Sequence, residues 1–287
     1  MAYKYSFTEL LLFPPLGLNE YRLKERLLGK TVLITGASFG IGESLAYKLA
    51  AAGTHLLLVA RTEEKLHEVK TRIENAGGKA TVFVTDISKP DEVKDLIDSL
   101  NRIPGGVDIL VNNAGKSIRR SIMESLDRPH DFSRTMAINY SGPVQLLLAL
   151  IPVLVKNKGQ IINVSTVSVL LAPTPKWAAY QASKSAFDQW FRCVSPELNA
   201  REVATTSIYL PLVRTRMIAP TSEYNNMPAM DPDHVAKVIC KSVISRKRKY
   251  VPWWLFSGQL GSLLFRGIWE SLNTRLLRRK SDYAQRS

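Results

Sequence analysis

The chain has 287 residues, of which 45% are hydrophobic and 22% are charged, and its formal net charge is +14. These proportions are those of a globular protein with a large core, and they exclude an intrinsically disordered chain. Its two cysteines, Cys193 and Cys240, stand in no metal-ligand spacing, so we predict neither a disulfide framework nor a metal site.

The N-terminal extension, residues 1–28, carries a short apolar run that Glu9 interrupts and that Pro14 and Pro15 end. It lacks the uncharged core of a signal peptide. No run of 18 uncharged apolar residues suggests a membrane-spanning helix elsewhere in the chain. We therefore predict a cytoplasmic protein.

From residue 29 to 250, short β-branched runs alternate with segments of helical period. Nearly continuous apolar strands between helices are typical of a parallel sheet that is covered on both faces. We therefore predict an α/β fold, a single Rossmann-like doubly wound parallel sheet with helices on both faces. Ser88, before Pro90, marks one helix start. The expected strands are 31–35, 55–60, 80–85, 107–112, 160–165 and 205–210.

A glycine-rich turn joins the first expected strand to the first helix. Glycines allow the backbone to turn tightly and to approach a pyrophosphate, whose charge meets the positive end of the helix. The strand-turn-helix context therefore predicts a dinucleotide site. Its residues are Gly36, Ser38, Phe39, Gly40, Ile41 and Gly42.

The end of the second strand indicates which dinucleotide binds. A site for NAD normally has a carboxylate there, which takes the ribose hydroxyls. This chain instead has Ala60 and Arg61. A guanidinium matches a phosphate dianion, so Arg61, with Ser38 and Thr62, predicts a site for the 2′-phosphate of NADP(H).

Five motifs in this order resemble the short-chain dehydrogenase/reductase family. They are the glycine turn from Thr35 to Gly42, Asp86 after the third strand, "NNAG" at 112–115, Asn139 in "MAINY", and Tyr180 with Lys184 four residues later. The resemblance implies that Asp86 and Ile87 bracket the adenine. It also implies a cofactor pocket shaped by Asn112, Ala114 and Gly115.

The resemblance continues after the sixth strand, although Leu212 replaces a family glycine. It implies that the backbone of Val213 and the hydroxyl of Thr215 hold the nicotinamide carboxamide. The segment from Arg216 to about Asp231 would then form a mobile substrate lid. Homodimers or homotetramers through helices near 131–150 and 177–199 are a further implication.

Tyr180 and Lys184 have the chemistry that carbonyl reduction needs. Hydride transfer builds negative charge on the carbonyl oxygen, so a proton donor must lie within reach of it. A lysine four residues after the tyrosine lies on the same helical face, where its charge is expected to lower the tyrosine pKa. The family resemblance implies that both residues also contact the cofactor, and Asn139 would anchor a water that relays protons to Lys184.

Thr166 and Ser168 are both candidates for the third catalytic hydroxyl. The family has N-x-S-S, with its second serine thirteen residues before the tyrosine, where this chain has Val167. Counting from the strand instead assigns Thr166, with one residue inserted in the following loop. An insertion in a loop costs little stability, whereas a one-residue slip in a buried strand turns every side chain to the other face of the sheet. Thr166 is therefore favoured over Ser168. Ser165 is interpreted as a polar residue at the end of the strand.

Residues 112–140 and 207–239 are similar to the bacterial fatty acyl-CoA reductases of this family. This similarity implies a long-chain acyl thioester, with CoA as the carrier, or an aldehyde as substrate. Arg119, Arg120 and Arg214 would either meet carrier phosphates or be surface charges. A ketone or secondary-alcohol dehydrogenase for a sterol-like, polyketide or 3-oxoacyl substrate is the alternative enzyme. A membrane-associated NADPH-binding scaffold or sensor is an alternative without turnover.

The C-terminal extension, residues 251–287, is basic and amphipathic. Residues 241–287 contain eleven Lys and Arg against two acidic residues, a net charge of +9. Apolar residues from Trp253 to Leu276 recur at steps of three and four, as in a helix that lies on a membrane surface or docks on protein. No nucleic-acid partner is predicted, because no aromatics of a recognised binding module accompany the charge.

Overall fold

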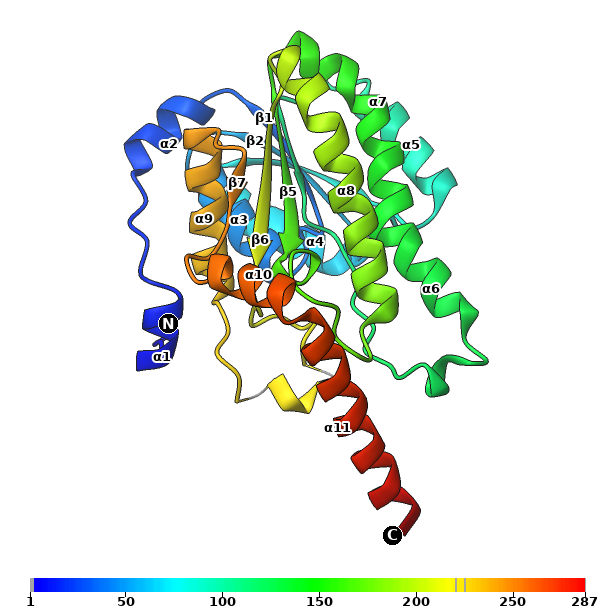
Figure 1. Cartoon of the computed structure of the whole chain (residues 1–287). Helices are drawn as coiled ribbons and strands as arrows, with labels where there is room; N and C mark the ends of the chain where they lie inside the picture. Colours follow the sequence, from blue (N-terminus) through cyan, green and yellow to red (C-terminus); the bar gives the residue numbers. More distant parts are fainter. Residues whose placement is uncertain (1–2, 220, 225, 287) are drawn as a thin grey trace.

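The computed structural model describes residues 3–219, 221–224 and 226–286, with side chains up to residue 278. Within these residues, seven parallel strands form one sheet in the order β3-β2-β1-β4-β5-β6-β7 (Figure 1). This confirms the predicted fold class. The strands are β1 (Thr31–Thr35), β2 (His55–Ala60), β3 (Lys79–Val84), β4 (Ile109–Asn112), β5 (Gln160–Thr166), β6 (Ala204–Leu210) and β7 (Lys249–Tyr250).

Helices cover both faces of the sheet because its strand residues alternate between two apolar cores. In β1, Val32 and Ile34 belong to one core and Leu33 belongs to the other. The first core is closed by α2 (Glu20–Leu27), α3 (Gly40–Ala50), α4 (Glu63–Asn75) and α9 (Pro232–Ser245). The second core is closed by α5 (Pro90–Leu100), α7 (Gly142–Lys156) and α8 (Ala178–Ala200).

Element boundaries differ from the prediction in a few places. The fourth strand begins at Ile109 instead of 107, and just before it the carboxylate of Asp108 accepts a hydrogen bond from Thr31 N at 2.9 Å. Ser88 does not cap α5, because its hydroxyl donates to Asp86 at 2.6 Å, and Lys89 takes the cap position. The strand β7 was not predicted, since it is only two residues long.

Residues 129–156 form one long helical stretch made of α6 (Pro129–Met136), a π-helical turn at Ala137–Ser141, and α7. By length and composition alone this stretch could cross a membrane. A core helix passes the same test, and Leu146, Leu150 and Leu154 of α7 are at most 2% exposed in the second core. It therefore gives little support for a membrane span.

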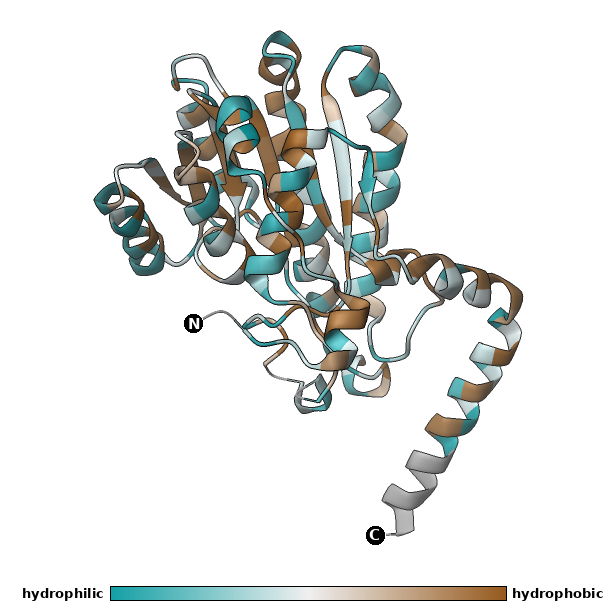
Figure 2. Ribbon diagram, turned by 90° about the vertical axis from the view of Figure 1, so that its left-hand side faces the viewer, coloured by the Kyte–Doolittle hydropathy of each residue, from teal (hydrophilic) through white to brown (hydrophobic). Residues whose placement is uncertain are grey.

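The two ends of the chain lie on the body in different ways. Leu23 and Leu27 of α2 are buried in the first core, and α1 (Phe7–Leu12) places Glu9 against Arg214 and Ala229. At the other end, Leu255 of α10 (Leu255–Leu264) is buried. The last helix, α11 (Arg266–Arg286), projects away from the sheet, and α10 is largely apolar (Figure 2).

Candidate active site

The predicted cofactor residues lie at the carboxyl edge of the sheet, beginning with the glycine turn between β1 and α3. Gly36 and Gly40 have φ of +69° and +59°, which glycine tolerates best. A Cβ on Gly42 would stand 2.1 Å from Gly36 O, so only glycine lets α3 approach the turn this closely. Thr215 packs over Gly40, where a Cβ would lie 3.0 Å from its methyl group. The turn therefore forms a cradle of exposed backbone at a helix N-terminus, which suits an anionic group.

Two residues that our sequence reasoning missed hold this turn against β4. Asn113 Nδ2 donates to Thr35 O at 3.0 Å and to Gly36 O at 3.2 Å. Thr35 Oγ1 accepts from the backbone N of Asn113 at 3.0 Å and of Ala114 at 3.1 Å. The threonine before Gly36 and the second asparagine of "NNAG" were the available signals.

Arg61 and Asp86 meet at the ends of β2 and β3. Arg61 Nη1 lies 3.5 Å from Asp86 Oδ2, and the arginine side chain is 60% exposed. Burial opposes ionisation of Asp86, but hydrogen bonds from Ser88 and the charge of Arg61 together lower its pKa. Beside them, Ser38 is 8% exposed in the glycine turn. Arg61 is thus held at the rim with its guanidinium accessible.

The remaining predicted cofactor residues lie near the glycine turn and along the same edge of the sheet. Phe39 precedes α3 and Ile41 lies in its first turn, and the guanidinium of Arg216 lies 4.2 Å from the centroid of the Phe39 ring. Ile87 is buried, and its carbonyl faces Gly142 so closely that a Cβ there would clash at 1.7 Å. Asn112 Nδ2 donates to Asn163 Oδ1 at 3.4 Å across β4 and β5.

Gly115 brings the predicted catalytic residues into one place. A Cβ at Gly115 would lie 3.0 Å from Asn139 Oδ1 and 3.4 Å from Lys184 Nζ. Asn139 lies in the π-helical turn, where its side chain accepts from Lys116 N and donates to Lys116 O, both at 2.9 Å. It also donates to Ser183 Oγ at 2.9 Å, so Asn139 is fixed between two segments.

Tyr180 and Lys184 occupy successive turns of α8, and burial perturbs both. Burial raises the pKa of Tyr180 to about 12, although the Thr166 hydroxyl opposes the rise. Our prediction that the pKa of Tyr180 is lowered is therefore wrong for the chain by itself. Lys184 directs its ammonium to Val164 O at 3.2 Å, and burial lowers its own pKa to about 8.

Of the three candidate hydroxyls, that of Thr166 is the one that influences the phenol of Tyr180. Thr166 ends β5, its hydroxyl acts on the phenol to lower the Tyr180 pKa against burial, and it donates to Ser168 Oγ at 3.2 Å. Ser168 lies one step further away in this chain of hydroxyls, in the short 3₁₀ turn Val167–Val169. Ser165 is buried on the side of Asp188. The geometry therefore favours Thr166 as the partner of Tyr180.

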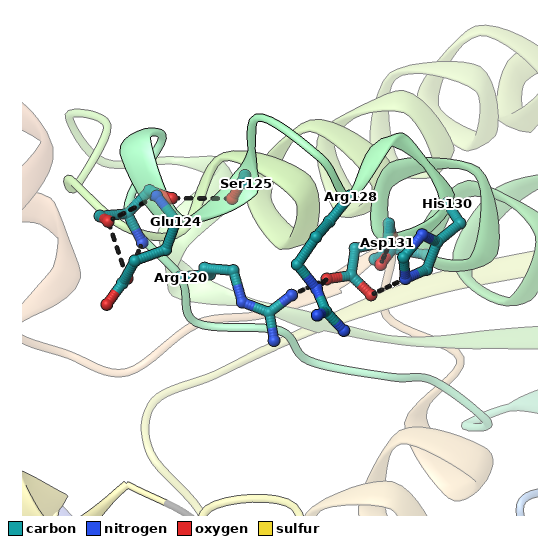
Figure 3. A network of polar contacts seen from close by, with 8 residues as sticks. Arg120, Glu124, Ser125, Arg128, His130 and Asp131 are labelled. Carbon is teal, nitrogen blue, oxygen red and sulfur yellow. Dashed lines mark hydrogen bonds and ion pairs between the residues drawn. The ribbon is translucent and has the colours of Figure 1, made fainter.

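The arginines that were expected near carrier phosphates are each paired with a carboxylate of the protein. Arg119 Nη2 lies 2.9 Å from Glu223 Oε1, and Arg214 pairs with Glu9. Arg120 pairs with buried Asp131, which Arg128 and His130 also face (Figure 3). The ion pairs account for these arginines within the protein, and a contact with carrier phosphates stays a prediction.

The segment after β6 contacts the surroundings of Tyr180 through Trp177. Val213 forms a parallel bridge with Met230, and Tyr224 stacks on Trp177 at 6.0 Å. Trp177 in turn contacts Tyr180 edge to face at 5.8 Å. The lid predicted for 216–231 includes positions 220 and 225, which lie outside the described residues, so its mobility stays a prediction.

Among the described residues, no three His, Cys, Asp or Glu side chains gather as a metal site requires. A cavity of about 630 Å³ opens beside the start of α8. Its walls come from the segment after β4, the start of α6, residues before Tyr180, and α11, which contributes Thr274 and Leu277.

Comparisons with known proteins show the family of the chain. A fatty acyl-CoA reductase of Acinetobacter baylyi is 47% identical over 231 residues, which are 80% of this chain and 78% of that protein. A fatty acyl-CoA reductase of Mycobacterium tuberculosis is 38% identical over 227 residues, 79% of this chain and 77% of its own length. A metagenomic short-chain oxidoreductase, solved in complex with NADP, aligns with a TM-score of 0.69 at 28% identity and covers 79% of this chain and 97% of its own. Residues 30–226 match the family model of the short chain dehydrogenases, and the chain is an oxidoreductase that belongs to this family.

Proposed function

We propose that this protein reduces an apolar carbonyl, either a long-chain acyl thioester or an aldehyde, with NADP(H) as the hydride carrier. The observation that carries the proposal is the constellation of Thr166, Tyr180, Lys184 and Asn139 beside Gly115, at the edge that also bears the glycine cradle. The names of the two reductases above support the substrate class.

The residues at this edge fit a phosphorylated dinucleotide. The backbone of Gly36 and Gly42 would take the pyrophosphate, and Arg61 with Ser38 would take the 2′-phosphate. Asp86 and Ile87 would flank the adenine, while Val213 and Thr215 would hold the carboxamide. When bound there, NADPH supplies the hydride.

The protein's own residues then handle the proton and the oxyanion. Tyr180 donates its phenolic proton to the carbonyl oxygen, and Thr166 donates a hydrogen bond to the developing charge. Lys184 supplies the positive charge that makes a phenolate tolerable within the site. With an acyl thioester, the resulting hemithioacetal loses its C–S bond to give an aldehyde and a free thiol.

The cavity beside α8 supports an apolar substrate. It is of the size typical of ligand pockets, and Ala178 and Ala179 of its wall immediately precede Tyr180. Leu277 and Leu276 are both exposed on α11, at 42% and 56%, but only Leu277 lines the cavity. Leu277→Asp is expected to lower kcat/KM for a tetradecanal-sized aldehyde about tenfold more than for a six-carbon aldehyde. Leu276→Asp is the matched control and should leave the ratio unchanged.

Purified protein with NADPH and palmitoyl-CoA tests the main proposal. We expect NADPH oxidation together with release of free thiol. Oxidation with ketones but no thiol release would favour the dehydrogenase alternative, whereas no oxidation with a panel of aldehydes, ketones and thioesters would leave only a binding role. A higher catalytic efficiency with NADH than with NADPH would contradict the cofactor assignment.

We also propose that α10 and α11 contact a membrane surface on the cytoplasmic side. Phe256 and Leu263 are 73% and 78% exposed, and Trp253 donates to Leu11 O at 3.1 Å, which places the exposed apolar residues of α1 nearby. Deletion of 251–287 should abolish co-sedimentation with anionic vesicles, and unchanged sedimentation would contradict the proposal. We also propose a homodimer or homotetramer through the helices near 131–150 and 177–199, which light scattering would detect.

A further inference from the structure

A buried carboxylate lies one helical turn beyond the catalytic lysine. Asp188 follows Lys184 by four residues on α8 and is only 3% exposed. Among the described residues, neither Asp188 Oδ1 nor Ser165 Oγ makes a hydrogen bond of normal geometry. A buried carboxylate that lacks full hydrogen bonding is costly, so its retention calls for a compensating charge.

The groups around Asp188 come from three elements. On α8 itself, the charges of Arg192 and Lys184 favour its ionised form. From the sheet, the hydroxyls of Ser165 on β5 and Tyr209 on β6 face it, and these two residues are register partners. Burial is nevertheless the largest influence and raises the pKa of Asp188.

Along α8, Tyr180, Lys184, Asp188 and Arg192 recur every four residues, so they share one face of the helix. Beyond the phenol of Tyr180 the charges alternate, with Lys184 positive, Asp188 negative and Arg192 positive. Arg192 ends the row at the exposed surface. Asp188 is the one carboxylate of this row, between two cations. It opposes the effect of burial on Lys184, because its charge raises the lysine pKa.

We propose that Asp188 is a positioning residue that keeps Lys184 charged and directed toward Tyr180 during catalysis. The inference rests on the proposed carbonyl reduction, for which Lys184 must be protonated. Without the carboxylate, the half-buried ammonium would lose its proton at a lower pH and would no longer support a phenolate.

The test is Asp188→Asn, with Asp188→Glu to keep the charge and Glu197→Gln as a control on an exposed position of the same helix. Two readouts are recorded against pH: kcat for NADPH oxidation with an aldehyde, and the rate at which acetic anhydride labels Lys184, followed by mass spectrometry. The labelling readout does not depend on turnover.

Lys184 works in its protonated form, so activity should fall as pH rises through about 8 in the wild type. In Asp188→Asn, both the alkaline limb of kcat and the labelling midpoint should move down by about 1 to 2 pH units. Asp188→Glu and Glu197→Gln should keep the wild-type midpoints.

An unchanged Lys184 midpoint in folded Asp188→Asn would overturn the inference, as would a midpoint moved by a full unit in Asp188→Glu. Absence of carbonyl reduction in the wild type with a shifted labelling midpoint would instead reject the proposed function alone. Thermal unfolding and NADPH binding of each variant separate a local electrostatic effect from loss of structure.

Discussion

Replacement of Thr166 by valine is the most direct test of how the hydroxyls are used. Valine keeps the β-branched shape that suits the end of β5 and removes only the hydroxyl. That hydroxyl lowers the pKa of the Tyr180 phenol against the effect of burial and is proposed to bond to the oxyanion of the substrate. A hydrogen bond to a charged group contributes about 1.5 to 3 kcal/mol, so kcat should fall about 10- to 100-fold.

The assay is steady-state NADPH oxidation with an aldehyde, accompanied by NADPH binding to show that the cofactor site is intact. Ser168→Ala is the matched variant, because Ser168 Oγ only accepts from Thr166 Oγ1 at 3.2 Å. Its kcat should stay within about fivefold of the wild type, the effect of one neutral hydrogen bond. If Ser168→Ala were inactive and Thr166→Val active, Ser168 would be the third catalytic hydroxyl and the assignment of Thr166 would be refuted.

Other regions of the chain give further expected outcomes. Arg61→Ala should raise KM for NADPH at least tenfold and leave KM for NADH nearly unchanged, since only NADPH has a 2′-phosphate; equal effects on both would contradict the assignment. Gly42→Ala should abolish NADPH binding in a fluorescence titration, because its Cβ would stand 2.1 Å from a backbone oxygen, whereas Gly261→Ala, with nothing within 4 Å, should bind normally. Burial opposes ionisation of Glu9, but hydrogen bonds, including that from Arg214, lower its pKa to about 2. The ionised Glu9 carboxylate therefore contributes to stability above the ordinary glutamate pKa, and this contribution is lost as pH falls toward 2. The Tm difference between wild type and Glu9→Gln should be large at pH 7 and shrink below pH 4. A difference that grows in acid would be inconsistent with this.

The sequence predicts well those features that depend on neighbours along the chain. Apolar runs between helical segments predict the parallel sheet, since a strand covered on both faces has no polar side. Spacing of four residues likewise places Tyr180 and Lys184 on one face of a helix. The glycine turn is recognisable because its conformation excludes side chains at Gly36 and Gly42.

Features that depend on distant segments could not be predicted in this way. The pKa of Tyr180 rises because the phenol is buried, with Trp177 edge to face against its ring and Tyr224 stacked on Trp177, and the sequence alone does not reveal that burial. Arg214 finds its carboxylate in Glu9, 205 residues earlier in the chain. An arginine in the sequence is therefore poor evidence for a ligand phosphate until the structure shows whether a carboxylate of the protein pairs with it.

The choice between Thr166 and Ser168 depends on whether the family motif is aligned from the strand β5 or from the spacing to Tyr180. β5 pairs with β6 residue by residue up to Thr166 and Leu210, and Ser165 opposite Tyr209 faces the buried Asp188. A slip by one position would turn Ser165 toward the phenol and place Thr166 in the buried cluster. The loop between the 3₁₀ turn at 167–169 and α8 has no such ladder, so it can accept one more residue at little cost. Strand register therefore fixes which hydroxyl faces Tyr180, and the spacing to the tyrosine is free to vary.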